Sequence, residues 1–157
     1  MLMFSKPNKT CTMTTIENLI LVGEIEKLFN ADAKAKKYIK DAKFILVSTD
    51  NVKYKMIMHL ASYPYEYHSQ AVLKYMEDNN LNEIYSYGGA KIVLGTIDDV
   101  LCHGKSYALK TANDEKLTEV VKSIWPNAEL EIMTSGVKVK EAMLFPKERI
   151  QYFAEHP

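Results

Sequence analysis

The chain has 157 residues, of which 47% are hydrophobic and 25% are charged. This length and composition are those of one globular domain with a sizeable core, and they argue against intrinsic disorder. The 20 basic and 20 acidic residues cancel, so the chain lacks the basic surplus with which nucleic-acid-binding proteins usually neutralise phosphates. A local basic patch could still bind a single phosphate group.

The sequence lacks the features that mark secreted, metal-binding and membrane proteins. The two cysteines, Cys11 and Cys102, lie far apart and form neither a disulfide framework nor a zinc-ligand motif. No apolar run approaches the roughly 20 residues that span a membrane. The N-terminal residues contain no acid before Glu17, but they lack the arginines of a transit peptide and the apolar core of a signal peptide. We therefore expect a cytoplasmic protein.

Residues 1–41 are predicted to be an N-terminal extension with one short helix, because Ile25, Leu28 and Phe29 recur at helical spacing. Four lysines follow between positions 34 and 40. Such a run is typical of a solvated face, and the neutral overall charge disfavours a nucleic-acid site there. We expect neither a nucleic acid nor a membrane as a partner.

The next segment carries stronger signals. The apolar run Phe44–Val47 ends at the turn signal Asp50-Asn51 and predicts a strand. Tyr54–Ala61 predicts a second strand, which is antiparallel to the first because the link is short. A helix is expected over residues 64–78, since Pro64 suits the first turn of a helix.

Strand and helix signals alternate in the rest of the chain. Four further strand-like runs occur, the first two separated by Gly88-Gly89: Ile84–Tyr87, Lys91–Leu94, Val100–His103 and Glu129–Ile132. A helix capped by Thr111 or Asn113 is expected before the last run, because apolar residues recur at positions 117, 120, 121 and 124. This order predicts an α/β domain over residues 42–134, with two α-helices packed on a mixed sheet of six strands. The tail 135–157 is expected to hold a helix near Lys147–Glu155.

Among the four histidines, His68 is the candidate catalytic residue because it lies in the opening turns of the helix expected over residues 64–78. The positive end of the helix dipole disfavours imidazolium there, so a neutral His68 could accept a proton. His59 and His103 are interpreted as partly buried structural residues, and His156 as an idle residue of the tail. The sequence contains no Cys-x-x-Cys, no His-x-x-x-His and no Gly-x-Ser-x-Gly motif.

The segment Gly104–Ala108 follows an expected strand and precedes an expected helix. A turn that opens with glycine can present successive backbone N–H groups to an anion, with help from the Ser106 hydroxyl. The segment is not a Walker A motif, and an ordinary connecting loop is the alternative. Lys43 opens the first expected strand, where lysines usually face the solvent.

Five segments occur together in an order that resembles the phosphohistidine phosphatases of the janus/ocnus family: Lys43–Val47, Glu66–His68, Gly88–Ile92, Gly104–Ala108 and Trp125-Pro126. The resemblance runs from about Ala42 to Ile132. It implies a six-stranded mixed sheet flanked by two helices. It also implies a phosphatase that acts on histidine-phosphorylated proteins without metal or cofactor. Separately, we expect the protein to be a monomer.

The resemblance implies a role for each candidate residue. His68 falls at the proton-acceptor position, Lys43 at a phosphate-contacting position, and Ser106, Tyr107 and Ala108 on the phosphate-holding loop. His68 would take a proton from the water that attacks phosphorus in line, while Lys43 and the loop N–H groups balance the charge. Attack by His68 itself, which gives a covalent intermediate, stays open.

The sequence departs from the family pattern at three places. Leu60-Ala61 replaces Arg-Gly, Ala90-Lys91 replaces a glycine and an arginine, and Leu109-Lys110 replaces an aromatic residue and a glycine. Because lysine resists backbone conformations that glycine permits, Lys110 predicts a changed lip of the site. The alternative is therefore a paralogue that binds phosphate or phosphopeptides with little or no turnover. The family also includes insect paralogues associated with sexual differentiation and testis expression.

Overall fold

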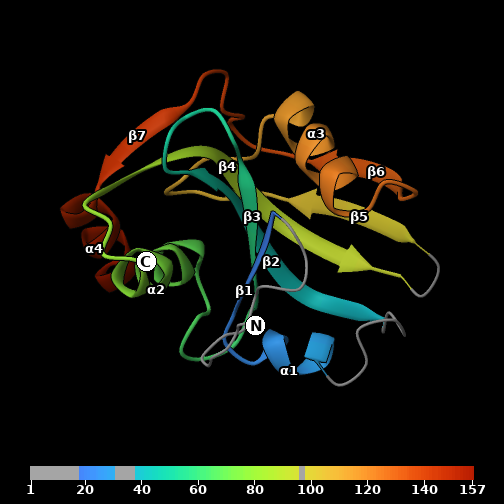
Figure 1. Cartoon of the computed structure of the whole chain (residues 1–157), viewed down its shortest axis with the longest axis horizontal. Coiled ribbons are helices and arrows are strands. Elements are labelled where there is room, and N and C mark those ends of the chain that lie inside the picture. Colours follow the sequence, from blue (N-terminus) through green and yellow to red (C-terminus); the bar gives the residue numbers. More distant parts are fainter. Residues whose placement is uncertain (1–17, 31–37, 96–97) are drawn as a thin grey trace, which may run out of the picture.

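A computed structural model describes residues 18–30, 38–95 and 98–157, which form one mixed open β-sheet with helices on both faces (Figure 1). The strands are β1 (Leu19–Val22), β2 (Ile39–Ser48), β3 (Lys55–Leu60), β4 (Glu83–Leu94), β5 (Asp99–Gly104), β6 (Glu129–Thr134) and β7 (Met143–Pro146). The helices are α1 (Ile25–Asn30), α2 (His68–Asp78), α3 (Asp114–Ile124) and α4 (Lys147–Glu155). The α/β class is confirmed. The prediction of six strands and two helices is wrong, because the described residues contain seven strands and four helices.

The strand order is β1-β3-β2-β4-β5-β6, and β7 pairs with the first part of β4. The pairs β1–β3 and β5–β6 are parallel, and the other pairs are antiparallel. The additional strands β1 and β7 come from the segments expected to be an extension and a tail. The division of the chain at residues 42 and 134 stays a prediction.

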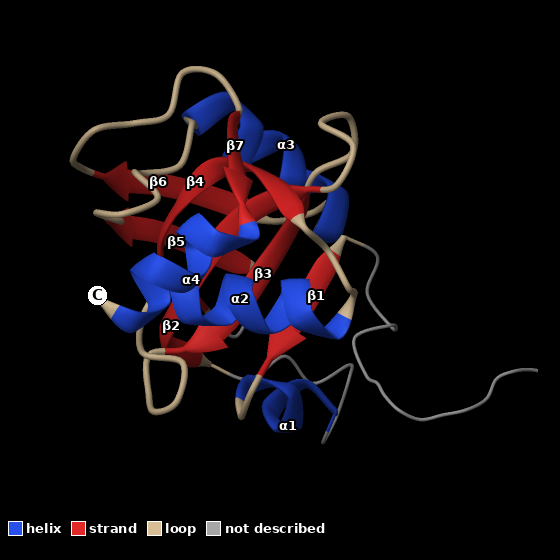
Figure 2. Cartoon of the chain, turned by 90° about the vertical axis from the view of Figure 1, so that its left-hand side faces the viewer, coloured by secondary structure: helices blue, strands red, loops and turns tan. Residues whose placement is uncertain are grey.

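Each face of the sheet is covered by its own helices (Figure 2). The core on one face is formed with α3, which buries Leu117, Val120, Val121 and Ile124, and α1 adds Ile25 to this core. The core on the other face is formed with α2 and α4, which bury Ala71, Val72, Met76 and Ile150. Alternate residues of β2 enter the two cores, as the period of two in a strand requires.

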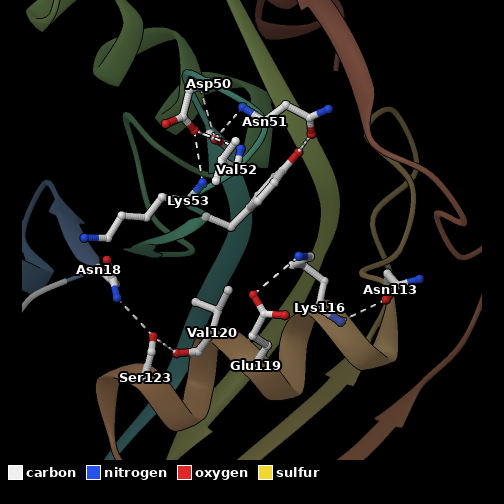
Figure 3. A network of polar contacts seen from close by, with 12 residues as sticks. Asn18, Asp50, Asn51, Val52, Lys53, Asn113, Lys116, Glu119, Val120 and Ser123 are labelled. Carbon is white, nitrogen blue, oxygen red and sulfur yellow. Dashed lines mark hydrogen bonds and ion pairs between the residues drawn. The ribbon is translucent and has the colours of Figure 1, made fainter.

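Local sequence explains the hairpin between β2 and β3 and the start of α3 (Figure 3). The Asp50 carboxylate accepts hydrogen bonds from the backbone N–H groups of Val52 (2.9 Å) and Lys53 (3.0 Å). These bonds hold the pKa of Asp50 down at about 2. Asn113 caps α3, since its side chain accepts a hydrogen bond from the Lys116 N–H at 2.9 Å.

Two boundaries near the candidate site differ from the prediction. α2 begins at His68 and not at Pro64, because Tyr67 is extended (φ −117°, ψ 153°) and serves as the N-cap. β4 continues through Gly88-Gly89, which were expected to separate two strands. The glycines instead allow close approach, since a Cβ at Gly88 would lie 2.7 Å from the backbone of Thr111.

Some sequence predictions concern residues outside the described ranges. These are Cys11, the acid-free N-terminal residues and the lysines at positions 34, 36 and 37. Within the described part of the chain, no helix is long and apolar enough to cross a membrane.

Candidate functional site

The segment 65–68 crosses one end of the sheet and contacts its strands one after another. The Tyr65 carbonyl accepts a hydrogen bond from Nδ1 of His59 on β3, at 2.6 Å. The Glu66 carbonyl accepts one from Nζ of Lys43 on β2, also at 2.6 Å. Because β3, β2 and β4 are neighbours in that order, the segment follows the order of the strands, and its last residue reaches β4.

That last residue, His68, has its imidazole fixed against β4. Its Nε2 lies 2.9 Å from the Ala90 carbonyl oxygen, which can only accept, so Nε2 carries the proton and donates it. The ring fits because Gly89 has no side chain. A Cβ at Gly89 would lie 2.9 Å from Cδ2 of His68 and would also collide with the Phe44 carbonyl oxygen.

His68 is neutral in the folded protein. The side chain is almost fully buried, and this burial lowers the pKa of His68 to about 3, although the hydrogen bond to Ala90 opposes the effect. The sequence predicted a neutral ring from the helix dipole, whereas burial is the main cause in the structure. Since Nε2 holds the proton, Nδ1 holds the lone pair. Within the described ranges, Nδ1 has no hydrogen-bond partner, and it is not one of the polar atoms that are completely shielded from solvent. Nδ1 is therefore the ring nitrogen that can accept a proton.

Lys43 places a positive charge beside this imidazole. Its Nζ donates to the Glu66 carbonyl and lies 5.1 Å from the centre of the Tyr67 ring, next to the start of α2. An ammonium group has three donors, and the bond to Glu66 uses one. Partial burial lowers the pKa of Lys43, and the neighbouring Lys91 lowers it further, whereas Glu66 raises it. Because one donor of the ammonium binds Glu66, two donors remain for an anion.

The strand registers extend this basic region across the sheet. Lys43 is paired with His59 on one side and with Lys91 on the other, and Lys91 is paired with His103 on β5. Directly paired residues share one face of a sheet, here the face covered by α2. Sequence reasoning missed a site role for His59 and Lys91. The available signal was alternation, which places His59 on the same face as Ile57.

The segment 104–111 is attached to β4 beside the glycine that accommodates His68. Thr111 forms a bridge with Gly89, and its Oγ1 accepts a hydrogen bond from the Ser106 N–H at 3.4 Å. Oγ1 also donates to the Ser135 carbonyl at 2.7 Å. Ser106 is thus linked to the surroundings of His68 through Thr111 and Gly89.

The residues of the predicted phosphate loop, 106–108, differ in their exposure to solvent. Ser106 is buried, whereas Tyr107 and Ala108 are exposed. Within the described ranges, the N–H groups of Tyr107 and Ala108 have no hydrogen-bond partner, so they can receive an anion. Lys110 adopts the left-handed conformation (φ 62°) that we expected lysine to resist, and it still connects the loop to the Gly89 N–H through its carbonyl (3.0 Å).

Among the residues that the structure describes, neither Cys102 nor the histidines outside the region around His68 form a second site. His156 stacks on Tyr152 with ring centres 4.4 Å apart, and Cys102 is buried. His103 is half-buried at the end of β5. Within the described ranges, no group of three or more histidine, cysteine or acidic side chains is arranged to hold a metal ion.

Comparison with known proteins does not assign the chain to a family, since no family model and no curated protein matches it.

Proposed function

We propose that the chain is a metal-independent protein phosphohistidine phosphatase of the janus/ocnus type, with His68 as its general base. One observation carries the proposal: a neutral His68 with an unbonded Nδ1 begins α2, and the Lys43 ammonium is bound two residues before it, at the Glu66 carbonyl. We assign the sheet to the fold of that family as part of the same proposal. The arrangement of α2 and α3 on opposite faces of a mixed sheet supports this assignment.

The proposed reaction uses groups at the start of α2 together with the loop that is linked to His68 through Thr111 and Gly89. Nδ1 of His68 takes a proton from water as the water oxygen attacks phosphorus and the P–N bond breaks. The products are inorganic phosphate and a histidine side chain, which takes its proton from the solvent. Lys43 and the N–H groups of Tyr107 and Ala108 stabilise the negative charge on the phosphoryl oxygens. The P–N bond is labile, so this modest set of groups suffices.

The release of phosphate from a phosphohistidine peptide, measured without added metal, tests the proposal. We expect turnover by the unchanged chain and a rate about 10²–10⁴-fold lower in His68→Ala, which is the usual contribution of general acid–base catalysis. His156→Ala is the matched control, because His156 is exposed and distant in sequence from the site. An undiminished rate in His68→Ala would reject the role. Phosphate bound covalently to His68 in quenched single-turnover samples would make His68 a nucleophile.

A second function, phosphopeptide binding without turnover, is favoured by the low pKa of His68. A general base is most effective when its pKa is near the working pH, and a pKa of about 3 makes a weak base. Calorimetry with a phosphohistidine peptide separates the two functions. Binding without release of phosphate would support the second function, and measurable turnover would exclude it.

A further inference from the structure

His59 has one ring nitrogen that is bonded and one that is not. Nδ1 lies 2.6 Å from the Tyr65 carbonyl oxygen and 3.3 Å from the Leu60 carbonyl oxygen. Both oxygens are acceptors, so Nδ1 carries the proton and donates it. Nε2 therefore holds a bare lone pair, and it is completely buried without a hydrogen-bond partner in the described part of the chain.

A bare buried acceptor destabilises a fold, and the neighbouring residues of β3 show the apolar alternative. Met56, Ile57 and Met58 are all fully buried without such a cost. An apolar side chain at position 59 would remove the unpaired nitrogen but would also remove the Nδ1–H donor. We therefore attribute the function of His59 to its Nδ1–H donor.

The Nδ1–H group of His59 holds the loop that carries the candidate site. Its acceptor, the Tyr65 carbonyl, comes directly before Glu66, whose own carbonyl binds Lys43, and three residues before the start of α2. The other side of Tyr65 is also fixed, because its ring packs on Gly23, where a Cβ would lie 2.8 Å from Cδ2 of Tyr65.

His59 is also in direct reach of both functional side chains. It is the cross-strand partner of Lys43 on β2. Its ring is perpendicular to that of His68, with an interplanar angle of 86° and ring centres 5.9 Å apart. Displacement of the 61–67 loop would therefore shift the His68 ring, its bond to Ala90 and the ammonium of Lys43 together.

We propose that His59 is a positioning residue, which fixes the tautomer of His68 and the place of Lys43 by its hydrogen bond to the Tyr65 carbonyl. The importance of His59 for turnover rests on the proposed function, whereas its role in positioning His68 and Lys43 does not. The resemblance that suggested His68 assigns no role to position 59. His59 acts through the loop and does not touch the substrate, since its side chain is fully enclosed.

Two substitutions distinguish the contribution of the Nδ1–H donor of His59 from that of the rest of its imidazole ring. In His59→Asn, the amide nitrogen takes the place of Nδ1 and can still donate to the Tyr65 carbonyl. In His59→Leu, a side chain of similar size fills the site without a donor. His103→Leu is the matched control, because His103 lies in the same row of the sheet, two strands away from Lys43.

Nitrogen-15 NMR of the histidine rings provides a measurement that does not depend on catalysis. We expect the unchanged chain, His59→Asn and His103→Leu to show His68 as a single tautomer with its proton on Nε2. We expect His59→Leu to lose this single tautomer. If the chain is a phosphatase, kcat of His59→Leu should also fall by up to about 100-fold, the effect of a displacement of roughly 1 Å, with kcat of His59→Asn nearly unchanged.

Either of two results would overturn the proposal. One is a folded His59→Leu protein in which the His68 tautomer is unchanged. The other is a folded His59→Asn protein in which that tautomer is lost, and this second result applies even where His59→Leu does not fold. A chain without phosphatase activity would reject the proposed function and leave the NMR comparison intact, so the two failures are distinguishable.

Discussion

The two buried histidines at the site should make the folded state sensitive to mild acid. Burial lowers the pKa of His59 to about 4 and that of His68 to about 3, from an ordinary value of 6.5. Above pH 6.5 both residues are neutral in the folded and the unfolded chain. Below it, the unfolded chain binds protons that the folded chain excludes, so stability is lost as the pH falls from about 6.5 towards the folded pKa values.

The size of the effect follows from the same pKa values. Between pH 7 and pH 5, proton linkage to each histidine lowers the free energy of unfolding by about 2 kcal/mol, and the two together by about 4 kcal/mol. A domain of this size is usually stable by only about 5–15 kcal/mol. The predicted loss is therefore a large fraction of the total.

Urea denaturation at pH 7, 6 and 5, followed by circular dichroism, measures this loss. His59→Asn and His68→Asn should each remove about half of the pH dependence, because each removes one of the linked protons. His156→Asn serves as the control, since His156 is exposed. An equal free energy of unfolding at pH 7 and pH 5, or the full pH-dependent loss in both variants, would show that the two histidines do not cause the sensitivity to acid.

Two further predictions concern local geometry. Gly89→Ala should lower the free energy of unfolding by about 1–3 kcal/mol, the usual range for overpacking, because the new Cβ would collide with the Phe44 carbonyl oxygen and would lie 2.9 Å from Cδ2 of His68. A free energy of unfolding equal to that of the unchanged chain would contradict this explanation. Asn113→Ala should lower the thermal midpoint through a loss of about 1 kcal/mol, because the Lys116 N–H loses its cap, and an unchanged midpoint would show that the cap is not stabilising.

The elements that were predicted are those whose signals lie within one short stretch of sequence. The hairpin β2–β3 depends on two apolar runs and the turn at Asp50, and α3 depends on one apolar stripe with its cap at Asn113. The helix at Lys147–Glu155 was also predicted from its own residues. In each case the stabilising contacts are local, so a single sequence contains the required information.

The elements that were missed depend on partners that are distant in sequence. β1 is an apolar run of four residues, Leu19–Val22, which becomes a strand because it pairs with β3. β7 is equally short and pairs with β4, about 60 residues earlier in the chain. Only the tertiary pairing distinguishes these segments from loops.

The candidate site was predicted unevenly for the same reason. His68 was identified because the start of a helix can be recognised locally, although that start was placed four residues too early. The pairings of Lys43 with His59 and Lys91 depend on the register of three strands, which no local signal specifies. The link between Ser106 and His68, which passes through Thr111 and Gly89, also depends on residues that are distant in sequence.

The surroundings of His68 have two opposite consequences, and the proposed function must reconcile them. The hydrogen bond to Ala90 holds the ring in the tautomer that leaves Nδ1 free, whereas burial lowers the pKa until the ring is a weak base. A phosphoryl group beside Nδ1 would bring negative charge into a poorly solvated place, and this charge would raise the pKa of His68. A neutral ligand would leave the ring a weak base. Recognition of the anion and activation of the base would therefore be one event, and a site that binds phosphate without raising the pKa of His68 would be a binding site only.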